Sequence, residues 1–165
     1  SETSKSVLWL YCTNDLARKN ILEQAAINNI ERKRIVFAEN VKIKNHLSRL
    51  KLADVFLDTY PYSAHTTASD AIRMNLPLVT LNGESFASRV AGSLLSSIGL
   101  EELISNNYEE YEEKAINLYN QPNELIRIKT KIENEKKNIL FNPKKFTKNL
   151  ENLYAKVCNI KSDVN

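Results

Sequence analysis

Glycine is scarce in this sequence, with three residues among 165, and the scarcity excludes several kinds of site. Neither a G-x-G-x-x-G motif nor a lysine-containing P-loop occurs, so a nucleotide site would have to be built without a glycine-rich loop. Long flexible linkers are excluded for the same reason. Internal repeats and low-complexity tracts are also absent.

Cysteine is equally sparse, and the two residues present, Cys12 and Cys158, form no C-x-x-C motif or Cys/His cluster. This argues against a zinc site, and we expect no metal and no cofactor. Two free, buried thiols fit a reducing, cytoplasmic location. No apolar run reaches the roughly 18 residues that cross a bilayer, and no signal peptide is recognisable, so we expect no membrane partner.

The net charge of +3 is too small to indicate a nucleic-acid partner. Segment 127–148 is locally basic, with eight basic residues against two acidic ones. A solvated helix face is the first interpretation of this segment, and a surface for an anionic partner is the second. With 42% hydrophobic and 26% charged residues, the chain has the composition of a globular domain with a core.

Apolar runs alternate with helical patterns over the first hundred residues. We expect strands at 6–12, 34–37, 54–58 and 77–81, and helices at about 15–28, 45–51, 66–75 and 85–98. Such alternation predicts an α/β fold, a Rossmann-like parallel sheet with helices on both faces. Asn14 is a suitable N-cap and Gly99 a suitable helix stop.

From about residue 105 the pattern is helical only, with helices expected at about 108–120, 123–139 and 144–158. We therefore expect a Rossmann-like core at 1–104 and a C-terminal helical extension of the same domain at 105–165. Loops 38–45, 59–65 and 82–85 follow predicted strands. Since ligands of parallel sheets bind beyond the carboxyl ends of the strands, we expect these loops to converge on one crevice.

The most informative segment runs from Asp58 to Asp70 and reads D-T-Y-P-Y-S-A-H-T-T-A-S-D. A strand leads through a short loop into a helix, and a helix N-terminus attracts phosphate through unpaired N–H groups and its dipole. Thr66 and Thr67 add hydroxyl donors there. Asp70, one turn further in, suits ribose hydroxyls, so the segment predicts a nucleoside diphosphate site. The alternative is an ordinary corner with Thr66 as N-cap.

Four motifs in this order resemble the catalytic region of protein O-GlcNAc transferases, glycosyltransferase family 41. They are L-A-D-V-F-L-D-T at 52–59, H-T-T-x-x-D at 65–70, P-L-V-T at 77–80 and G-E-S-F-A-S-R-V at 83–90. Similarity continues through E-L-I at 102–104, Y-E-E-Y at 108–111, L-F-N at 140–142 and L-E-x-L-Y at 150–154. The resemblance spans nearly the whole chain.

The resemblance implies a GT-B architecture, in which two Rossmann-like lobes hold a sugar nucleotide between them and TPR repeats often precede both. This chain would be most of the C-terminal, donor-binding lobe. The N-terminal lobe, together with the first strand and helix of this lobe and the lysine they carry, would lie outside it. The partners implied are a UDP-sugar, the missing lobe and an acceptor protein or peptide.

The resemblance also implies roles for individual residues. His65, Thr66 and Thr67 would hold the pyrophosphate, and Asp70 would accept from the ribose hydroxyls. His46 and Arg49 would lie beside the nucleotide, and the backbone at Val41 would read the uracil edge. The family's nucleotide-contacting lysine aligns with Ile43, and Lys44 would replace it only if the loop shifted.

The implied reaction is an inverting, metal-independent transfer of a sugar, GlcNAc in first place, from UDP to a protein hydroxyl. Glucose transfer to asparagine is a second hypothesis, and a non-catalytic binding module, favoured by Ile43, is a third. A receiver domain is a weaker fourth, because its acidic pair is missing from the first strand. Asp58 and Asp70 also suggest a carboxylate pair for glycoside cleavage, but a strand-end carboxylate such as Asp58 favours a structural hydrogen bond.

We expect the 165-residue chain alone to bind UDP weakly, if at all, and to transfer no sugar, because it would be an excised portion of a larger enzyme. Isothermal titration with UDP and an assay of sugar transfer test this. Nanomolar binding or turnover by these residues alone would contradict it.

Overall fold

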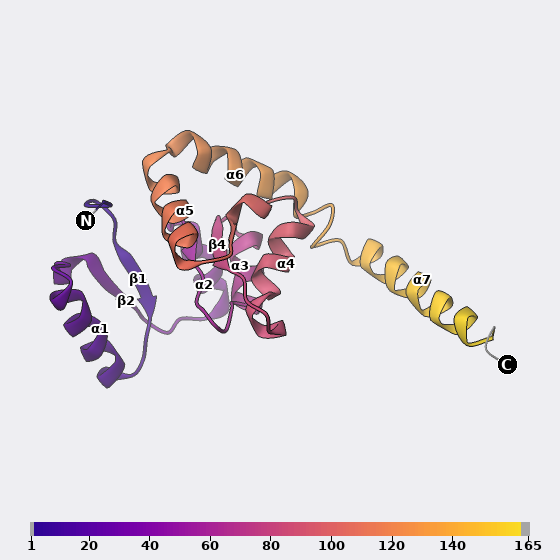
Figure 1. The fold of residues 1–165 in the computed structure, drawn as a ribbon, viewed down its shortest axis with the longest axis horizontal. Helices are drawn as coiled ribbons and strands as arrows, with labels where there is room; N and C mark the ends of the chain where they lie inside the picture. The colour runs from indigo at the N-terminus through magenta and orange to yellow at the C-terminus, as the bar shows by residue number, and fades with distance from the viewer. Residues whose placement is uncertain (1, 163–165) are drawn as a thin grey trace. The chain divides into compact units, whose positions relative to one another are not determined.

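The chain has an α/β architecture with parallel strands, as the alternating pattern predicts (Figure 1). The structure, a computed structural model, describes the backbone of residues 2–162 and the side chains of residues 2–158. It divides into two compact units at the step from Leu52 to Ala53, and each is described by itself. The expected boundary near residue 104 stays a prediction. Within residues 2–162, no helix has the length and apolarity needed to cross a membrane.

The first unit is a two-stranded parallel sheet with two α-helices. Its elements are β1 (Leu8–Tyr11), α1 (Asp15–Ile27), a 3₁₀ turn (Arg32–Arg34), β2 (Ile35–Ala38) and α2 (Ile43–Leu50). β1 and β2 are in register with Leu8 opposite Ile35. Asn14 caps α1 as predicted, because its side chain accepts a hydrogen bond from the Ala17 N–H at 2.9 Å. Helix α2 begins two residues before the predicted start.

The second unit contains a three-stranded parallel sheet in the order β3-β4-β5. Its elements are β3 (Phe56–Leu57), α3 (Thr66–Arg73), β4 (Leu78–Leu81), α4 (Val90–Ser97), β5 (Ile104–Ser105), α5 (Tyr108–Asn120), α6 (Pro122–Glu135) and α7 (Pro143–Ser162). All four residues of β4 are buried, so both faces of this strand are covered. Helices α3 and α4 contact β4 and each other, and α5 contacts β4 and β5.

The sequence predicts one long helix over 85–98, and this prediction is wrong for residues 85–89. A 3₁₀ helix at Phe86–Ser88 precedes α4, which begins at Val90. The Ser85 hydroxyl accepts from the Ser88 N–H at 3.2 Å, and this local bond replaces the first turn of an α-helix. Gly99 ends α4 with a φ of 69°, a conformation that glycine adopts without the steric cost of a Cβ, so the predicted stop is confirmed.

Much of the basic charge in segment 127–148 is engaged within the second unit. The Arg127 guanidinium pairs with Glu102 at 2.8 Å and with Glu124 at 2.6 Å. Lys136 is 7% exposed, and its ammonium donates to the carbonyl of Arg73 at 2.8 Å. The Arg127–Glu102 and Lys136–Arg73 contacts tie α6 and its C-terminal end to segments that precede it, so a purely solvated face does not describe this segment.

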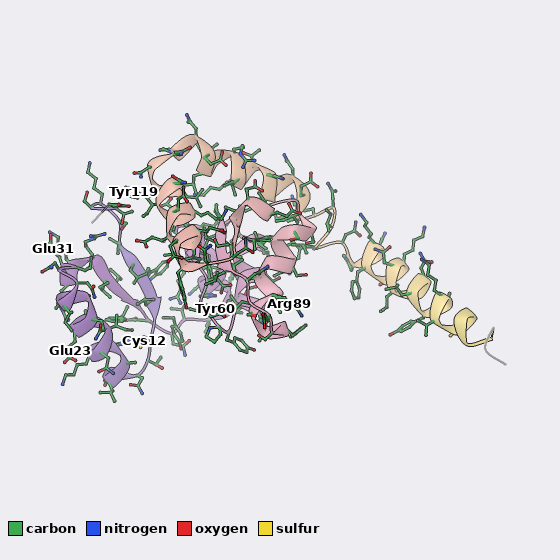
Figure 2. The ribbon with its side chains drawn as sticks, in the orientation of Figure 1. Cys12, Glu23, Glu31, Tyr60, Arg89 and Tyr119 are labelled. Atoms are coloured by element: carbon green, nitrogen blue, oxygen red, sulfur yellow. The ribbon has the colours of Figure 1, made fainter. Side chains whose placement is uncertain are left out.

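The two cysteines are free, as predicted, but they are not buried. Cys12, labelled in Figure 2, is half-buried, and Cys158 on α7 is exposed. The apolar core of the second unit is instead built by α4, β4 and α6, with Leu95, Leu78 and Ile132 fully buried.

Two isoleucines of α6 test how the core supports the second unit. Replacing Ile132, which is 0% exposed, by alanine should lower the free energy of unfolding by about 2–5 kcal/mol, because the substitution leaves a cavity. The matched control Ile126→Ala, at a position that is 62% exposed, should change it by less than about 0.5 kcal/mol. Urea-induced unfolding followed by circular dichroism measures both. Equal effects would contradict the observed packing.

Candidate functional site

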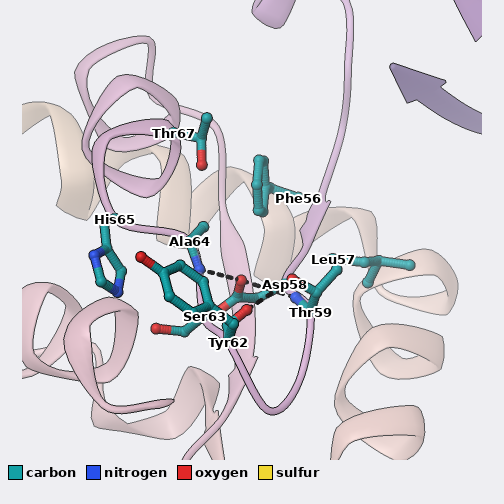
Figure 3. A pocket seen from close by; sticks show the side chains of 9 residues that line it. All are labelled: Phe56, Leu57, Asp58, Thr59, Tyr62, Ser63, Ala64, His65 and Thr67. Carbon is teal, nitrogen blue, oxygen red and sulfur yellow. Dashed lines mark hydrogen bonds between the residues drawn. The ribbon is translucent and has the colours of Figure 1, made fainter. Parts of the chain in front are cut away.

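A depression of about 250 Å³ lies beyond the carboxyl end of β3, where the loop to α3 turns back (Figure 3). It is lined by Phe56, Leu57, Asp58, Thr59, Tyr62, Ser63, Ala64, His65 and Thr67. Small-molecule sites typically measure about 300–1,000 Å³. The depression therefore has room for part of a nucleotide, such as its diphosphate, rather than for a whole sugar nucleotide.

The carboxylate of Asp58 holds this loop in place and is 7% exposed. Its Oδ1 accepts from the N–H groups of Thr59 at 2.8 Å and Ala64 at 2.7 Å, and its Oδ2 accepts from the Thr80 hydroxyl at 2.7 Å. Figure 3 shows the two backbone bonds as dashed lines. The structural role expected for Asp58 is confirmed, since all three donors come from the protein itself.

The loops after β3 and β4 are joined at Ser63, which is buried. Its N–H and its hydroxyl both donate to the carbonyl of Ala87, at 2.9 and 2.7 Å. The His65 Nε2 lies 3.3 Å from the same oxygen. The contact is made by Ala87, just after the predicted loop 82–85, and no residue of 82–85 lines the depression, so convergence of the loops on one crevice stays a prediction. Loop 38–45 belongs to the first unit.

Helix α3 presents an open N-terminus to this region. His65 is its N-cap residue and makes no side-chain capping bond, so the alternative that made Thr66 the N-cap is wrong. Thr66 and Thr67 are the first two helical residues, and their N–H groups have no carbonyl partner within the helix. Within the described residues, no hydrogen bond engages the hydroxyls of Thr66 and Thr67 or the half-buried carboxylate of Asp70.

Aromatic rings fix the orientation of the His65 imidazole. Tyr62 stacks on it with ring centroids 4.8 Å apart and an interplanar angle of 19°, and Phe86 meets it edge-on at 6.1 Å. Figure 3 shows the Tyr62 ring beside the His65 imidazole. Tyr62 lines the depression, whereas Phe86 is not among its lining residues.

The other four predicted site residues lie in the first unit, around α2. The Arg49 guanidinium contacts His46 Nδ1 at 3.1 Å, donates to the carbonyl of Glu39 at 2.8 Å and lies 5.5 Å from the centre of the Trp9 ring. His46 and Arg49 are thus brought together. Val41 and Lys44 are exposed, one just before α2 and the other in its first turn, next to the exposed Ile43.

At the start of α3, the N–H groups and hydroxyls of Thr66 and Thr67 and the imidazole of His65 are groups that can bind an anion. In the part of the chain that the structure describes, no three His, Cys, Asp or Glu side chains gather as metal ligands would. The second unit offers hydrogen-bond donors at a helix N-terminus, a place where anions bind in proteins.

Tyr111 on α5 is a contributor to this region that sequence reasoning missed. Its half-buried phenol donates to the backbone carbonyl of Asp58 at 2.8 Å, across 53 positions of sequence. Burial, and after it the charge of the Asp58 carboxylate, raises the pKa of Tyr111 to about 12. A local sequence pattern cannot predict a contact between residues so far apart in the chain.

The sequence of this chain matches the model of one protein family and the sequences of known proteins. The sequence model of "Glycosyl transferase family 41" matches residues 1–150. A protein of Arabidopsis thaliana named a probable UDP-N-acetylglucosamine–peptide N-acetylglucosaminyltransferase SEC is 36% identical over 157 residues, 94% of this chain. A UDP-N-acetylglucosamine–peptide N-acetylglucosaminyltransferase of Caenorhabditis elegans is 32% identical over 93% of this chain. The chain spans 16% and 13% of their lengths.

The structure of this chain also resembles a solved structure. A solved structure of a mutant O-GlcNAc transferase from Thermobaculum terrenum superposes with a TM-score of 0.83 and 28% sequence identity. The match covers 91% of this chain and 30% of that one.

Replacing Tyr111 by phenylalanine tests the contact beneath the site. Loss of the hydrogen bond should lower the free energy of unfolding by about 1 kcal/mol at pH 7. The raised folded-state pKa of Tyr111 means that its stabilisation is complete below about pH 10 and is lost as the pH rises towards 12. Wild-type stability should therefore fall over that interval more steeply than that of Tyr111→Phe, as urea titrations at each pH would measure.

Tyr108→Phe is the control, because Tyr108 lies on the same helix and is 64% exposed. It should change the free energy of unfolding at pH 7 by less than about 0.5 kcal/mol. Parallel pH profiles for wild type and Tyr111→Phe would contradict the proposed linkage.

Proposed function

The chain belongs to glycosyl transferase family 41, and on that premise we propose that it is the donor-binding part of an inverting protein O-glycosyltransferase that uses UDP-GlcNAc. The observation that carries the proposal is the open N-terminus of α3 at the edge of the depression after β3. Its free N–H groups and two exposed threonine hydroxyls are donors for the two phosphates of a nucleoside diphosphate.

Each site residue of the second unit has a role in this proposal. Thr66, Thr67 and the adjacent backbone N–H groups bind the pyrophosphate, and the His65 ring, which stacks on Tyr62, also contacts it. Asp70 lies one helical turn from the phosphate donors and accepts from ribose hydroxyls. A carboxylate is suited to that contact because charge-assisted hydrogen bonds are stronger than neutral ones.

For the first unit, described by itself, we propose the nucleotide contacts that the family resemblance implies for the residues around α2. Arg49, held by His46, supplies positive charge for the nucleotide, and the backbone near Val41 pairs with the uracil edge. Lys44 is the available cation next to Ile43, the position where the family has its lysine. These assignments rest on the family resemblance and on the internal contacts that hold Arg49.

The chemistry proposed for the whole enzyme is the displacement of UDP by a protein hydroxyl. As the bond from the sugar to the diphosphate breaks, negative charge develops on the leaving phosphate oxygen. Donors placed before the reaction stabilise that charge without reorganising, and the start of α3 provides such donors, so the proposed transfer needs no metal. The names of the relatives, which specify UDP-N-acetylglucosamine and peptides, support GlcNAc as the sugar and a polypeptide as the acceptor.

UDP binding to the full-length protein that carries this chain tests the proposal. Isothermal titration in the presence of EDTA should show saturable binding of UDP, and Thr67→Val should weaken it about tenfold through loss of a donor to a charged group. Binding that requires a divalent metal ion, or no binding at all, would contradict the proposal.

The assignment of Asp70 has its own test. Wild type should bind UDP about tenfold more tightly than 2′,3′-dideoxyuridine diphosphate, and Asp70→Ala should abolish that preference because the ribose contact is lost. Asp54→Ala is a matched control, since this exposed carboxylate pairs with Lys129 at 3.6 Å and lies outside the depression. A preference that persists in Asp70→Ala would contradict the assignment.

A further inference from the structure

We propose that Asp58 is a positioning residue for donor binding: by bonding the Ala64 N–H, it sets where α3 begins and where the His65 ring lies. The inference rests on the proposed function, because the groups that Asp58 positions are the proposed diphosphate donors. Asp58 itself would contact no ligand, unlike the proposed diphosphate donors.

The first step is that Asp58 is unavailable to a substrate. Its side chain is buried, and its two oxygens already accept three hydrogen bonds of 2.7–2.8 Å. A carboxylate with this environment is not an open general base or nucleophile, so a pairing of Asp58 with Asp70 for glycoside cleavage is not supported. Any effect of Asp58 on binding must pass through the groups it holds.

The second step is the position of those groups. The bond from Ala64 to Asp58 closes the loop that follows β3, and Ala64 directly precedes His65, the N-cap residue of α3. The Thr80 hydroxyl donates a hydrogen bond to the same carboxylate. The loop is therefore attached to β4, a strand in which every residue is buried. These hydrogen bonds fix the position of the first residues of α3 relative to the sheet.

The third step is the consequence of removing the carboxylate. The N–H groups of Thr59 and Ala64 would lose their acceptor, and the loop would shift to find another one. A displacement of about 1 Å in a positioning element is enough to weaken a preorganised site strongly. Asparagine, in contrast, keeps an oxygen for both N–H groups, and its amide can donate to the Thr80 hydroxyl, which is free to rotate.

The experiment compares four forms of the full-length protein by isothermal titration with UDP. Relative to wild type, Asp58→Ala should weaken UDP binding at least tenfold, and Asp58→Asn should stay within about threefold. Leu118→Ala is the stability control, because Leu118 is buried on α5 and lies outside the depression. It should lower the Tm as Asp58→Ala does while leaving the affinity for UDP within about twofold.

Hydrogen exchange of the Ala64 amide provides the second readout. Its protection should be lost in Asp58→Ala and retained in Asp58→Asn and Leu118→Ala. Undiminished UDP affinity in Asp58→Ala, or an equal loss in Leu118→Ala, would overturn the positioning role and leave the proposed function standing. Failure of wild type to bind UDP would overturn the proposed function, and this inference with it.

Discussion

The parallel pairing of β3 with β4 is the constraint on which the second unit's site depends. The N–H of Phe56 donates to the Pro77 carbonyl at 2.7 Å, and that of Asp58 donates to the Val79 carbonyl at 3.0 Å. This register brings Asp58 and Thr80 to the same edge of the sheet. Because every residue of β4 is buried, a slip of one position would turn its side chains to the wrong faces. The loops that start at this edge therefore have fixed origins.

Side-chain hydrogen bonds, rather than a glycine-rich sequence, hold the loop between β3 and α3. A buried carboxylate and a buried serine hydroxyl fold the loop between β3 and α3, and the start of α3 supplies the donors. Glycine is used where two loops approach closely: a Cβ at Gly83 would lie 2.6 Å from the Ser88 Oγ and 3.0 Å from the Tyr60 ring. A sequence with three glycines thus still folds a tight loop in front of a helix N-terminus, where the proposed diphosphate site lies.

Local patterns predict much of this fold because most of its elements depend on neighbouring residues. The capping bond of Asn14 and the stop at Gly99 follow from residue type and position. Strand β5 is two residues long, too short for a periodic signal, and was missed. The 3₁₀ helix before α4 depends on a hydroxyl bond that competes with helix formation. At the site, the segment from His65 to Asp70 was evident, but the contacts of Asp58 with Thr80 and Tyr111 join distant segments and have no local signature.

Each set of candidate residues includes one side chain that internal contacts hold without any ligand. In the first unit, Arg49 is held by His46, by the Glu39 carbonyl and by the face of Trp9. In the second, His65 is held between aromatic rings. Ordering a flexible arginine on binding would cost about 0.5–1.5 kcal/mol, and a guanidinium already fixed avoids that cost. For the same reason, substitutions beneath these groups should affect binding although they touch no ligand, because the advantage of preorganisation lies in the supporting contacts.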